Sequence, residues 1–382
     1  MKVNIFPIVS SLHEETRINE QTQLLLDELI KCSNHQFNIV EIDDFYDADL
    51  SLILIQSGGS EGLFLSNFDK LKEPFYLLTY GHNNSLAASL EILSYIKDND
   101  LKGEILHGNT EYLNTRINEL LNKPQRLGVI GKPSDWLIAS QVDYEKVKVL
   151  HNIELVDVDI DEIVDMYNIE KNYDISYDFC KEELVKSTKL HFVLSKILSK
   201  YNLNGLTIRC FSLLEKLNTT ACLGLALLND KGIISTCEGD IPAMISMHIL
   251  NKITGCPGFQ ANPSRIDVIN KRMVLAHCTL PLSMTKNYKL DTHFESGIGV
   301  AVKGEMKEET ITIFKLSKDL RNYYVSTGKI IKNLNEPNLC RTQIEISVDE
   351  NIEYFLNRPY GNHHIIVYGD YKEEITEYMK KF

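Results

Sequence analysis

Short apolar runs alternate with amphipathic stretches over the first third of the chain. The runs that predict buried strands are residues 3–9, 37–42, 50–56 and 74–80. Residues 16–30 and 86–96 place apolar side chains at helical spacing. Near-continuous apolar strands separated by helices are typical of a parallel sheet covered on both faces. We therefore expect an N-terminal Rossmann-like α/β domain over residues 1–123.

The same pattern starts again after a proline-containing boundary at residues 122–125. Apolar runs predict strands, and a long polar stretch at 159–188 predicts helix. The predicted strands are 127–130, 154–158, 206–210, 223–228 and 233–236. Residues 131–136 read as a turn leading into a helix. A second α/β domain is expected over residues 124–266.

From about residue 267 the pattern becomes one of strands with Gly and Asn turns and little helix between them. The predicted strands are 272–277, 298–302, 310–316, 322–332 and 341–348, followed by a closing helix at 371–382. This indicates a β-rich, barrel-like third domain over residues 267–382. The expected fold class is α/β, with two Rossmann-like parallel-sheet domains followed by that domain.

Composition narrows the classes of function. The chain has 382 residues, 43% of them hydrophobic, and a formal net charge of −13. That charge argues against nucleic acid or an anionic membrane as the main partner, because both need a concentrated basic face. The N-terminus lacks the pattern of a signal peptide, and no run approaches the ~18 apolar residues of a membrane span. A cytoplasmic protein is expected.

Eight cysteines are spread along the chain without a CxxC pair or zinc-finger spacing. We expect reduced thiols and no structural disulfide. A nucleophilic Cys237 or Cys278 beside His277 is an alternative that lacks a recognisable local signature.

Two glycine turns follow predicted strands of the first domain, at residues 57–62 and 81–85. The first precedes a helix, as a nucleotide-binding loop would, but it matches neither GxGxxG nor GxxxxGK[ST]. Two interpretations of this segment therefore remain open: a plain strand-to-helix turn, or the nucleotide-binding loop of a nucleotide-dependent enzyme. Ligands of open α/β sheets collect at the carboxyl ends of strands, so the second turn, with His82, can contribute to a site.

Carboxylates and histidines gather between residues 238 and 293, and two more histidines stand at 363 and 364. The members of this group before the C-terminal pair are Glu238, Asp240, His248, Asn262, Asp267, His277 and His293. Carboxylate and imidazole ligands together suit Mn²⁺, Co²⁺ or Fe²⁺. The structural alternative is that Asp240 caps the helix that begins at Ile241-Pro242, and that His277 is a core histidine.

An ordered series of segments resembles the L-fucose isomerase and L-arabinose isomerase superfamily, in its shorter fucose-isomerase-like branch. The segments are Gly131-Lys132-Pro133-Ser134-Asp135-Trp136-Leu137-Ile138, Arg209-Cys210-Phe211, Cys237-Glu238-Gly239-Asp240, Leu275-Ala276-His277-Cys278, His293-Phe294-Glu295-Ser296-Gly297, Gly361-Asn362-His363-His364 and Tyr368-Gly369-Asp370. Each is weak alone, whereas the series spans nearly the whole chain. The resemblance implies aldose–ketose isomerisation through a cis-enediol with a divalent metal, usually Mn²⁺. It also implies a homo-oligomer, a trimer or hexamer, with sites at subunit interfaces and a small sugar as partner.

Carried over by position, the resemblance makes Glu238 the first metal-binding carboxylate and the base. The second carboxylate of fucose isomerases stands in a Phe-x-x-Asp context, where this chain has Phe259-Gln260-Ala261-Asn262. The C-terminal histidine ligand matches His363, with His364 as the adjacent alternative, and His277 resembles a further histidine of the arabinose enzymes. The proposed metal set is thus Glu238, Asn262 and His363, with Glu238 and Asn262 as the catalytic pair.

Asn262 is the main departure from the family pattern. An amide oxygen can coordinate Mn²⁺, but it adds no charge and cannot act as a general acid near neutral pH. Two hypotheses follow: a retained isomerase, or a non-catalytic sugar-binding or sensing relative with a degenerate metal site. The candidate sugar contacts are His82, Asn83, Asn84, Ser134, Trp136, Arg209 and His277.

Overall fold

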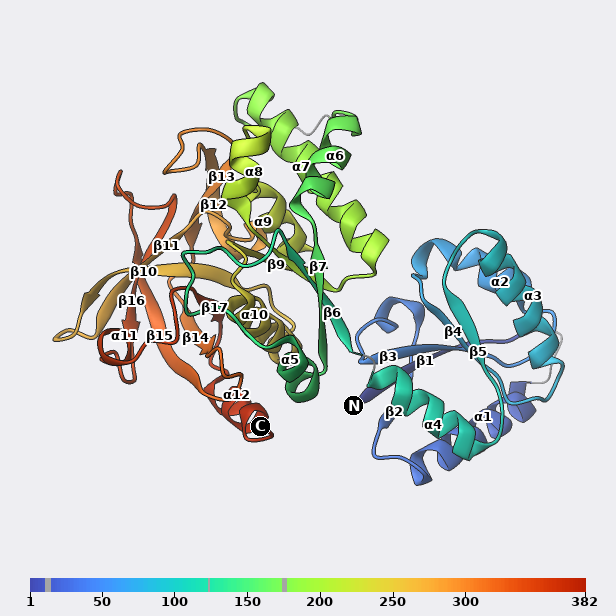
Figure 1. The fold of residues 1–382 in the computed structure, drawn as a ribbon. Coiled ribbons are helices and arrows are strands. Elements are labelled where there is room, and N and C mark those ends of the chain that lie inside the picture. The colour runs from blue at the N-terminus through green and yellow to red at the C-terminus, as the bar shows by residue number, and fades with distance from the viewer. Residues whose placement is uncertain (11–14, 123, 174–176) are drawn as a thin grey trace. The chain divides into compact units, whose positions relative to one another are not determined.

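The computed structural model describes the whole chain except residues 11–14, 123 and 174–176 (Figure 1). Backbone contacts divide the chain into two compact units, Met1–Lys123 and Pro124–Phe382. Parallel sheets and a C-terminal antiparallel barrel confirm the expected fold class. The division into three domains, with a boundary at residue 266, stays a prediction.

Unit 1 is a five-stranded parallel sheet in the order β2-β1-β3-β4-β5. Its strands are β1 (Lys2–Ile8), β2 (Gln36–Ile39), β3 (Leu50–Ile55), β4 (Phe75–Leu78) and β5 (Gly103–Leu106). Its helices are α1 (Glu15–Lys31), α2 (Glu61–Ser66), α3 (Ser85–Asp98) and α4 (Thr110–Leu121), with single 3₁₀ turns at Ile42–Asp44 and Phe68–Lys70. Helices α1 and α4 pack on one face of the sheet and α2 and α3 on the other (Figure 1). Both faces are therefore covered, as the near-continuous apolar strands predicted.

The two glycine turns of unit 1 lie side by side after β3 and β4. The backbone N–H of Gly58 donates to the carbonyl of Asn83 at 2.7 Å. Gly59, Gly81, Asn83 and Asn84 all have positive φ angles, which suit glycine and asparagine. The turns thus support each other at the carboxyl edge of the sheet.

The first part of unit 2 is a four-stranded parallel sheet in the order β7-β6-β8-β9. Its strands are β6 (Gln125–Ile130), β7 (Ile153–Val158), β8 (Gly205–Ile208) and β9 (Ile234–Cys237). Its helices are α5 (Tyr144–His151), α6 (Ile160–Ile169), α7 (Lys181–Tyr201), α8 (Cys210–Leu217), α9 (Cys222–Asp230) and α10 (Ile241–Thr254). Helix α10 has Asp240 as its N-cap, Pro242 in its first turn and Gly255 in a left-handed conformation after its last residue.

Two sequence expectations in this part were wrong. Residues 223–228, predicted as a strand, lie in α9. That helix is apolar on nearly all sides because it is buried between neighbours, so its sequence has no helical period to read. Residues 131–136 form turns that do not lead directly into a helix, since α5 begins only at Tyr144.

The second part of unit 2 is a closed antiparallel barrel in the order β10-β11-β16-β15-β14-β17. Its strands are β10 (Phe259–Asp267), β11 (Arg272–His277), β14 (Thr310–Leu316), β15 (Tyr323–Asn333), β16 (Thr342–Val348) and β17 (His364–Tyr368). A separate two-stranded sheet joins β12 (Thr285–Asp291) to β13 (Ala301–Met306). The remaining elements are a 3₁₀ turn at Leu282–Met284 and the helices α11 (Tyr354–Asn357) and α12 (Lys372–Met379). Sequence analysis missed β10, β12 and β17 and placed β13 a few residues early.

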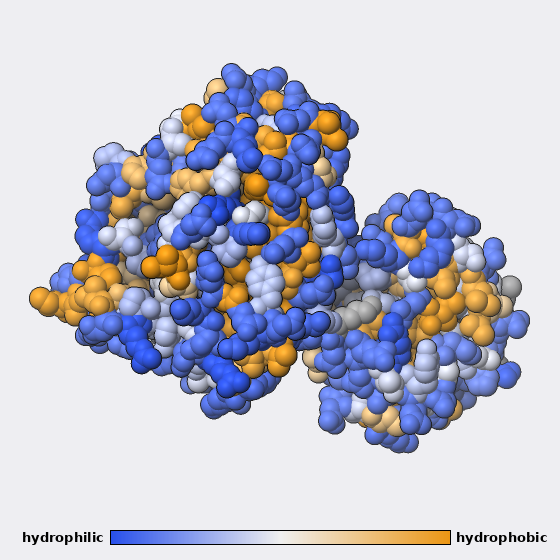
Figure 2. Space-filling model, viewed as in Figure 1, coloured by the Kyte–Doolittle hydropathy of each residue, from blue (hydrophilic) through white to orange (hydrophobic). Residues whose placement is uncertain are grey.

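The face shown in Figure 2 is mostly hydrophilic, with apolar side chains exposed in both units. Among the helices that the structure describes, none is both long and apolar enough to cross a membrane. Among the residues that the structure describes, the most exposed large apolar side chain is Ile269, 94% exposed in the turn that joins β10 to β11.

Candidate functional site

Glu238 follows the last residue of β9 in an unusual backbone conformation. Its φ is +64°, and Gly239 follows with a φ of +70°. A left-handed conformation costs a residue with a Cβ about 1–2 kcal/mol, so the surrounding structure must hold it there. The carbonyl of Glu238 accepts a hydrogen bond from the N–H of Ser134 at 3.3 Å, and the N–H of Gly239 donates to Ile208. The turn thereby fixes the direction of the Glu238 side chain.

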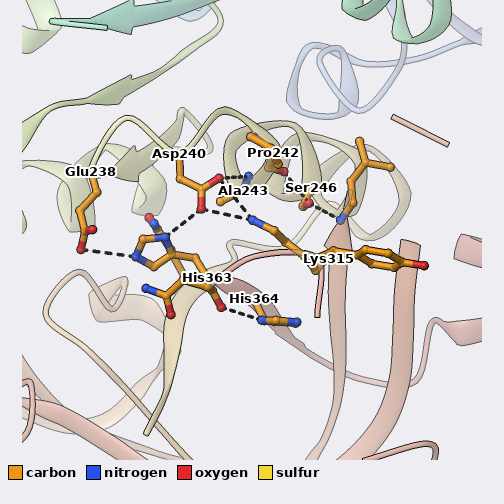
Figure 3. Close-up of polar contacts among 12 residues, drawn as sticks. Glu238, Asp240, Pro242, Ala243, Ser246, Lys315, His363 and His364 are labelled. Atoms are coloured by element: carbon orange, nitrogen blue, oxygen red, sulfur yellow. Dashed lines mark hydrogen bonds and ion pairs between the residues drawn. The ribbon is translucent and has the colours of Figure 1, made fainter. Parts of the chain in front are cut away.

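Asp240 both caps a helix and joins a buried charged group. Its Oδ1 accepts a hydrogen bond from the N–H of Ala243 at 2.9 Å, which is the capping role expected from the sequence. Its Oδ2 lies 2.9 Å from Nδ1 of His363 and 3.2 Å from Nζ of Lys315 (Figure 3). Asp240, Lys315 and His363 are all fully buried. Opposite charges and hydrogen bonds compensate for removing these groups from water.

His363, rather than His364, faces Glu238. Its Nε2 lies 3.4 Å from Oε1 of Glu238. His364 uses Nδ1 on the carbonyl of Asn362 and Nε2 on the Tyr354 hydroxyl. Burial lowers the pKa of His364 to about 3, so it is a neutral core histidine.

The charges of Glu238 and His363 stabilise each other. Burial alone would raise the pKa of Glu238, but the hydrogen bond and charge of His363 outweigh it and lower that pKa to about 2. For His363, burial opposes the charged form, whereas its contacts with Asp240 and Glu238 raise its pKa to about 9. At neutral pH Glu238 is therefore a carboxylate and His363 an imidazolium that a metal would have to deprotonate.

Three adjacent strands of the barrel supply the rest of the cluster. Asn262 of β10 pairs with Ala276, next to His277 at the end of β11, and Ala261 pairs with His364, next to His363. One donor atom each of Glu238, His277 and His363 lie within 4.8 Å of one another. Thr279 Oγ1 lies 3.2 Å from Nδ1 of His277, which leaves Nε2 for a ligand.

The donor set fits a divalent metal. One buried polar atom at this place, Oδ1 of Asn262, has no hydrogen-bond partner within the described part of the chain, and Nε2 of His363 has only the long 3.4 Å contact with Glu238. Unpaired buried polar atoms are uncommon in native proteins and call for an explanation such as an ion or a water. One carboxylate, two imidazoles and an amide oxygen are ligands that Mn²⁺ and similar ions accept. His277, whose pKa is lowered to about 4 mainly by burial, is already neutral, as a ligand must be.

Trp136 and Arg209 stand beside Glu238. The indole Nε1 of Trp136 donates to Oε2 of Glu238 at 3.1 Å, while the side chain remains 49% exposed. Arg209 lies over the Trp136 ring at 5.7 Å and forms a two-pronged ion pair with Asp135, at 3.2 and 2.5 Å. Ser134 is fully buried, and its hydroxyl has no partner among the described residues.

Several polar residues of the sequence cluster lie elsewhere. His82 belongs to unit 1, where it is exposed beside Tyr80. His248 lies on α10, and Asp267 caps the turn after β10 through Asn270. A role for His82 in sugar binding stays a prediction.

A pocket in unit 2 adjoins this cluster. The residues that line it are Cys210, Phe211, Leu214, Thr220, Cys222, Cys237, Glu238, Asn262, His277, Cys278, His293, Glu295 and Cys340. Cys237 and Cys278, which the sequence offered beside His277 as an alternative, both line it, whereas Cys210, Cys222 and Cys340 were not expected there. The buried Lys315, on the far side of His363, was also not predicted, although it alternates in phase with the buried Ile311 and Ile313 of β14.

Fold and cluster together define an α/β protein with a C-terminal barrel and a Glu/His/His cluster that could bind a divalent metal. No protein-family model matches the sequence. The chain is similar to proteins named sulfoquinovose isomerase from Priestia aryabhattai and Priestia megaterium, 23% identical over 287 residues, or 69% of this chain. A protein of the same name from Clostridium sp. is 25% identical over 184 residues, which are 45% of this chain and 41% of that protein. The similarity spans 64% of the length of the Priestia proteins.

Proposed function

We propose that the chain is a metal-dependent aldose–ketose isomerase that acts on a pentose, hexose or deoxysugar through a cis-enediol. The observation that carries the proposal is the meeting of Glu238, His277 and His363 within 4.8 Å, beside the unpaired amide oxygen of Asn262. Similarity to proteins named as isomerases of a sugar supports the same reaction class.

Glu238, His277 and His363 would hold the metal, with Oδ1 of Asn262 as a further ligand. This set adds His277 to the ligands expected from the sequence. A divalent ion such as Mn²⁺ would polarise the carbonyl oxygen and the neighbouring hydroxyl oxygen of the sugar. Asp240 would keep His363 in the orientation that directs Nε2 at the ion, as carboxylate partners of metal-bound histidines do.

Glu238 is the group we assign to proton transfer between C1 and C2. It is ionised at neutral pH, and it is held by Trp136 on one oxygen and faces His363 with the other. The carboxylate takes the proton from C2, which leaves an enediolate, and returns it to C1, while a proton passes from O2 to O1 so that the carbonyl forms at C2. Asn262 cannot share this work because an amide does not ionise.

Side chains around Trp136 are suited to the sugar itself. The Trp136 and Phe211 rings meet edge to face at 5.3 Å, and Phe211 meets His293 at 5.9 Å. Such an aromatic wall offers apolar faces for sugar C–H groups, and Arg209 offers hydrogen-bond donors, whereas a contact from the fully buried Ser134 would require its hydroxyl to be uncovered. A homo-oligomer with sites at subunit interfaces belongs to the same proposal and predicts a particle mass several times that of one chain.

The direct test is a screen of aldoses with the purified chain and Mn²⁺, Co²⁺, Mg²⁺ or Fe²⁺, in which ketose formation is followed. The panel includes pentoses, hexoses, deoxysugars and sulfoquinovose, the sugar in the relatives' name. We expect turnover of at least one sugar that depends on the metal and disappears in Glu238→Gln. Absence of turnover across the panel with every metal would contradict the isomerase proposal.

Asn262 favours a second candidate, a sugar-sensing relative that binds without turnover. This candidate predicts that a sugar raises the melting temperature of the protein while no product forms. Asn262→Asp separates the two. A gain of Mn²⁺ binding and activity in this variant indicates a degenerate natural site, whereas loss of an existing activity shows that the amide belongs to the mechanism.

A further inference from the structure

Five of the eight cysteines line the pocket beside Glu238. All eight cysteines lie in the described part of the chain, and all are free thiols. Two of the five are in direct contact at a known distance: the thiol of Cys237 donates to Sγ of Cys210 at 3.0 Å. A disulfide bond is about 2.05 Å long, so the two sulfur atoms need to approach by only ~1 Å to be joined.

Strand pairing brings these two thiols together, and hydrogen bonds fix the backbone of Cys237. Strands β8 and β9 are neighbours, with Ile208 paired to Cys237, and Cys210 comes two residues after Ile208. The side chain of Gln260 makes two hydrogen bonds to the backbone of Cys237. Its Oε1 accepts from the N–H of Cys237 at 2.7 Å, and its Nε2 donates to the carbonyl of Cys237 at 3.3 Å. Cys237 is 3% exposed, whereas Cys210 is only partly buried at the start of α8. Cys210 is therefore the thiol that a small reagent reaches first.

We propose that Cys210 and Cys237 are an oxidisable pair that hydrogen peroxide converts into a reversible disulfide beside Glu238. The Cys210 sulfur attacks one oxygen of peroxide; an S–O bond forms, the O–O bond breaks, and the proton of the thiol joins the departing hydroxide as water. The Cys237 sulfur then attacks the sulfenic sulfur of Cys210; the S–S bond forms, the S–O bond breaks and a second water leaves. Two thiols lose two electrons and two protons, and one peroxide becomes two waters.

The disulfide would affect the site through the residues that follow each cysteine, Glu238 and Phe211. Cys237 directly precedes Glu238, whose backbone is already in a left-handed conformation. Cys210 directly precedes Phe211, whose ring packs against Trp136, and Trp136 binds the Glu238 carboxylate. Drawing the sulfur atoms together displaces Glu238 from its contact with His363. Weaker Mn²⁺ binding after oxidation is the expected result, and this part rests on the proposed metal site.

The test uses the full chain, treated with hydrogen peroxide, alkylated, digested and analysed by mass spectrometry. We expect one cross-linked peptide pair joining Cys210 to Cys237, a fall of two in the count of eight free thiols, and reversal by dithiothreitol. Cys210→Ser, at the partly exposed position, should abolish the cross-link without disturbing the buried one. Cys32→Ser, an exposed cysteine of unit 1, is the matched control and should cross-link as the unaltered chain does.

Mn²⁺ titration of the reduced and oxidised chains gives the second measurement, with roughly tenfold weaker binding expected after oxidation. Oxidation of Cys210 to sulfinic acid without a cross-link would overturn the proposal. So would a dominant cross-link between Cys278 and either Cys222 or Cys340, its neighbours in a small apolar cluster. Failure of the reduced chain to bind Mn²⁺ would instead contradict the metal site, and the cross-link would still be read by mass.

Discussion

Nδ1 of His363 lies 2.9 Å from Oδ2 of Asp240, and both side chains are fully buried. The contact directs the opposite ring nitrogen of His363 at Glu238. Lys315 lies against the same carboxylate and balances its charge. A helix cap, a buried ion pair and the orientation of a candidate ligand therefore depend on one aspartate.

Asp240→Asn should weaken Mn²⁺ binding by roughly 10- to 100-fold, because His363 loses the carboxylate that orients it. The single variant would also leave Lys315 as an unpaired buried charge, which costs roughly 3–5 kcal/mol of stability. The comparison therefore uses Asp240→Asn with Lys315→Met, measured by calorimetric titration against Lys315→Met alone. Equal Mn²⁺ affinity in the two proteins would contradict an orienting role for Asp240.

Trp136→Phe should keep the aromatic ring but remove the hydrogen bond from Nε1 to Glu238. Hydrogen bonds to charged groups contribute about 1.5–3 kcal/mol, so Mn²⁺ binding should weaken by roughly tenfold at this half-exposed position. The control is Ile138→Ala, which changes an 84% exposed side chain of the same loop. If both variants bind Mn²⁺ alike, the indole does not position the carboxylate.

Gly239→Ala should destabilise the protein by roughly 3 kcal/mol, from the left-handed φ and from crowding. An added Cβ would lie 2.8 Å from the carbonyl oxygen of Lys132 and 2.9 Å from Cα of Pro133. The matched control is Gly232→Ala, where φ is +74° but the new Cβ meets no described atom within 4 Å. Only the conformational cost of about 1–2 kcal/mol is expected there. Urea unfolding measures both, and equal losses would show that the Gly239 turn has room for a side chain.

The sequence predicted the alternating α/β part of the fold well because buried parallel strands have a strong apolar signal. Residues 310–316 coincide with β14, and most other predicted strands differ from the observed ones by a few residues. Helix α9 was misread because a helix buried on all sides loses its polar face. Strand β10 was missed because its outer half is exposed and polar and includes Pro263.

The candidate site was predictable only as residue types. Glu238, His277 and His363 were singled out, yet their convergence depends on pairing of β10 with β11 and β17, which no local pattern encodes. The resemblance to a family made His363 the first candidate and His364 the alternative. Both ring nitrogens of His364 contact other groups, so His364 is not available as a ligand. Contacts across 75 and 123 residues, from Asp240 to Lys315 and His363, lie beyond sequence reasoning of this kind.

His248 should make the protein less stable in acid. Burial, helped by the charge of Lys252, lowers its pKa to about 4 in the folded state, against an ordinary value of 6.5. Between these values the unfolded chain binds a proton that the folded chain does not. The contribution of His248 to the free energy of unfolding is therefore fully present above pH 6.5 and is lost as the pH falls toward 4. The free energy of unfolding should fall by up to about 2 kcal/mol between pH 7.5 and 5.

The check is urea unfolding of His248→Gln at both pH values. Its loss between pH 7.5 and 5 should be smaller than that of the unaltered chain by the same amount, since glutamine does not titrate. An unchanged pH dependence in His248→Gln would mean that other groups account for it.

The donors of the candidate site are spread from the end of β9 to the start of β17, which follows the other five strands of the barrel in the sequence. A nascent chain still on the ribosome can present Glu238 and His277 long before His363 has been made. These donors cannot meet until β17 closes the barrel between β10 and β14. Metal acquisition would then follow the synthesis and pairing of β17, and an ion could not serve as a template for earlier folding of the barrel.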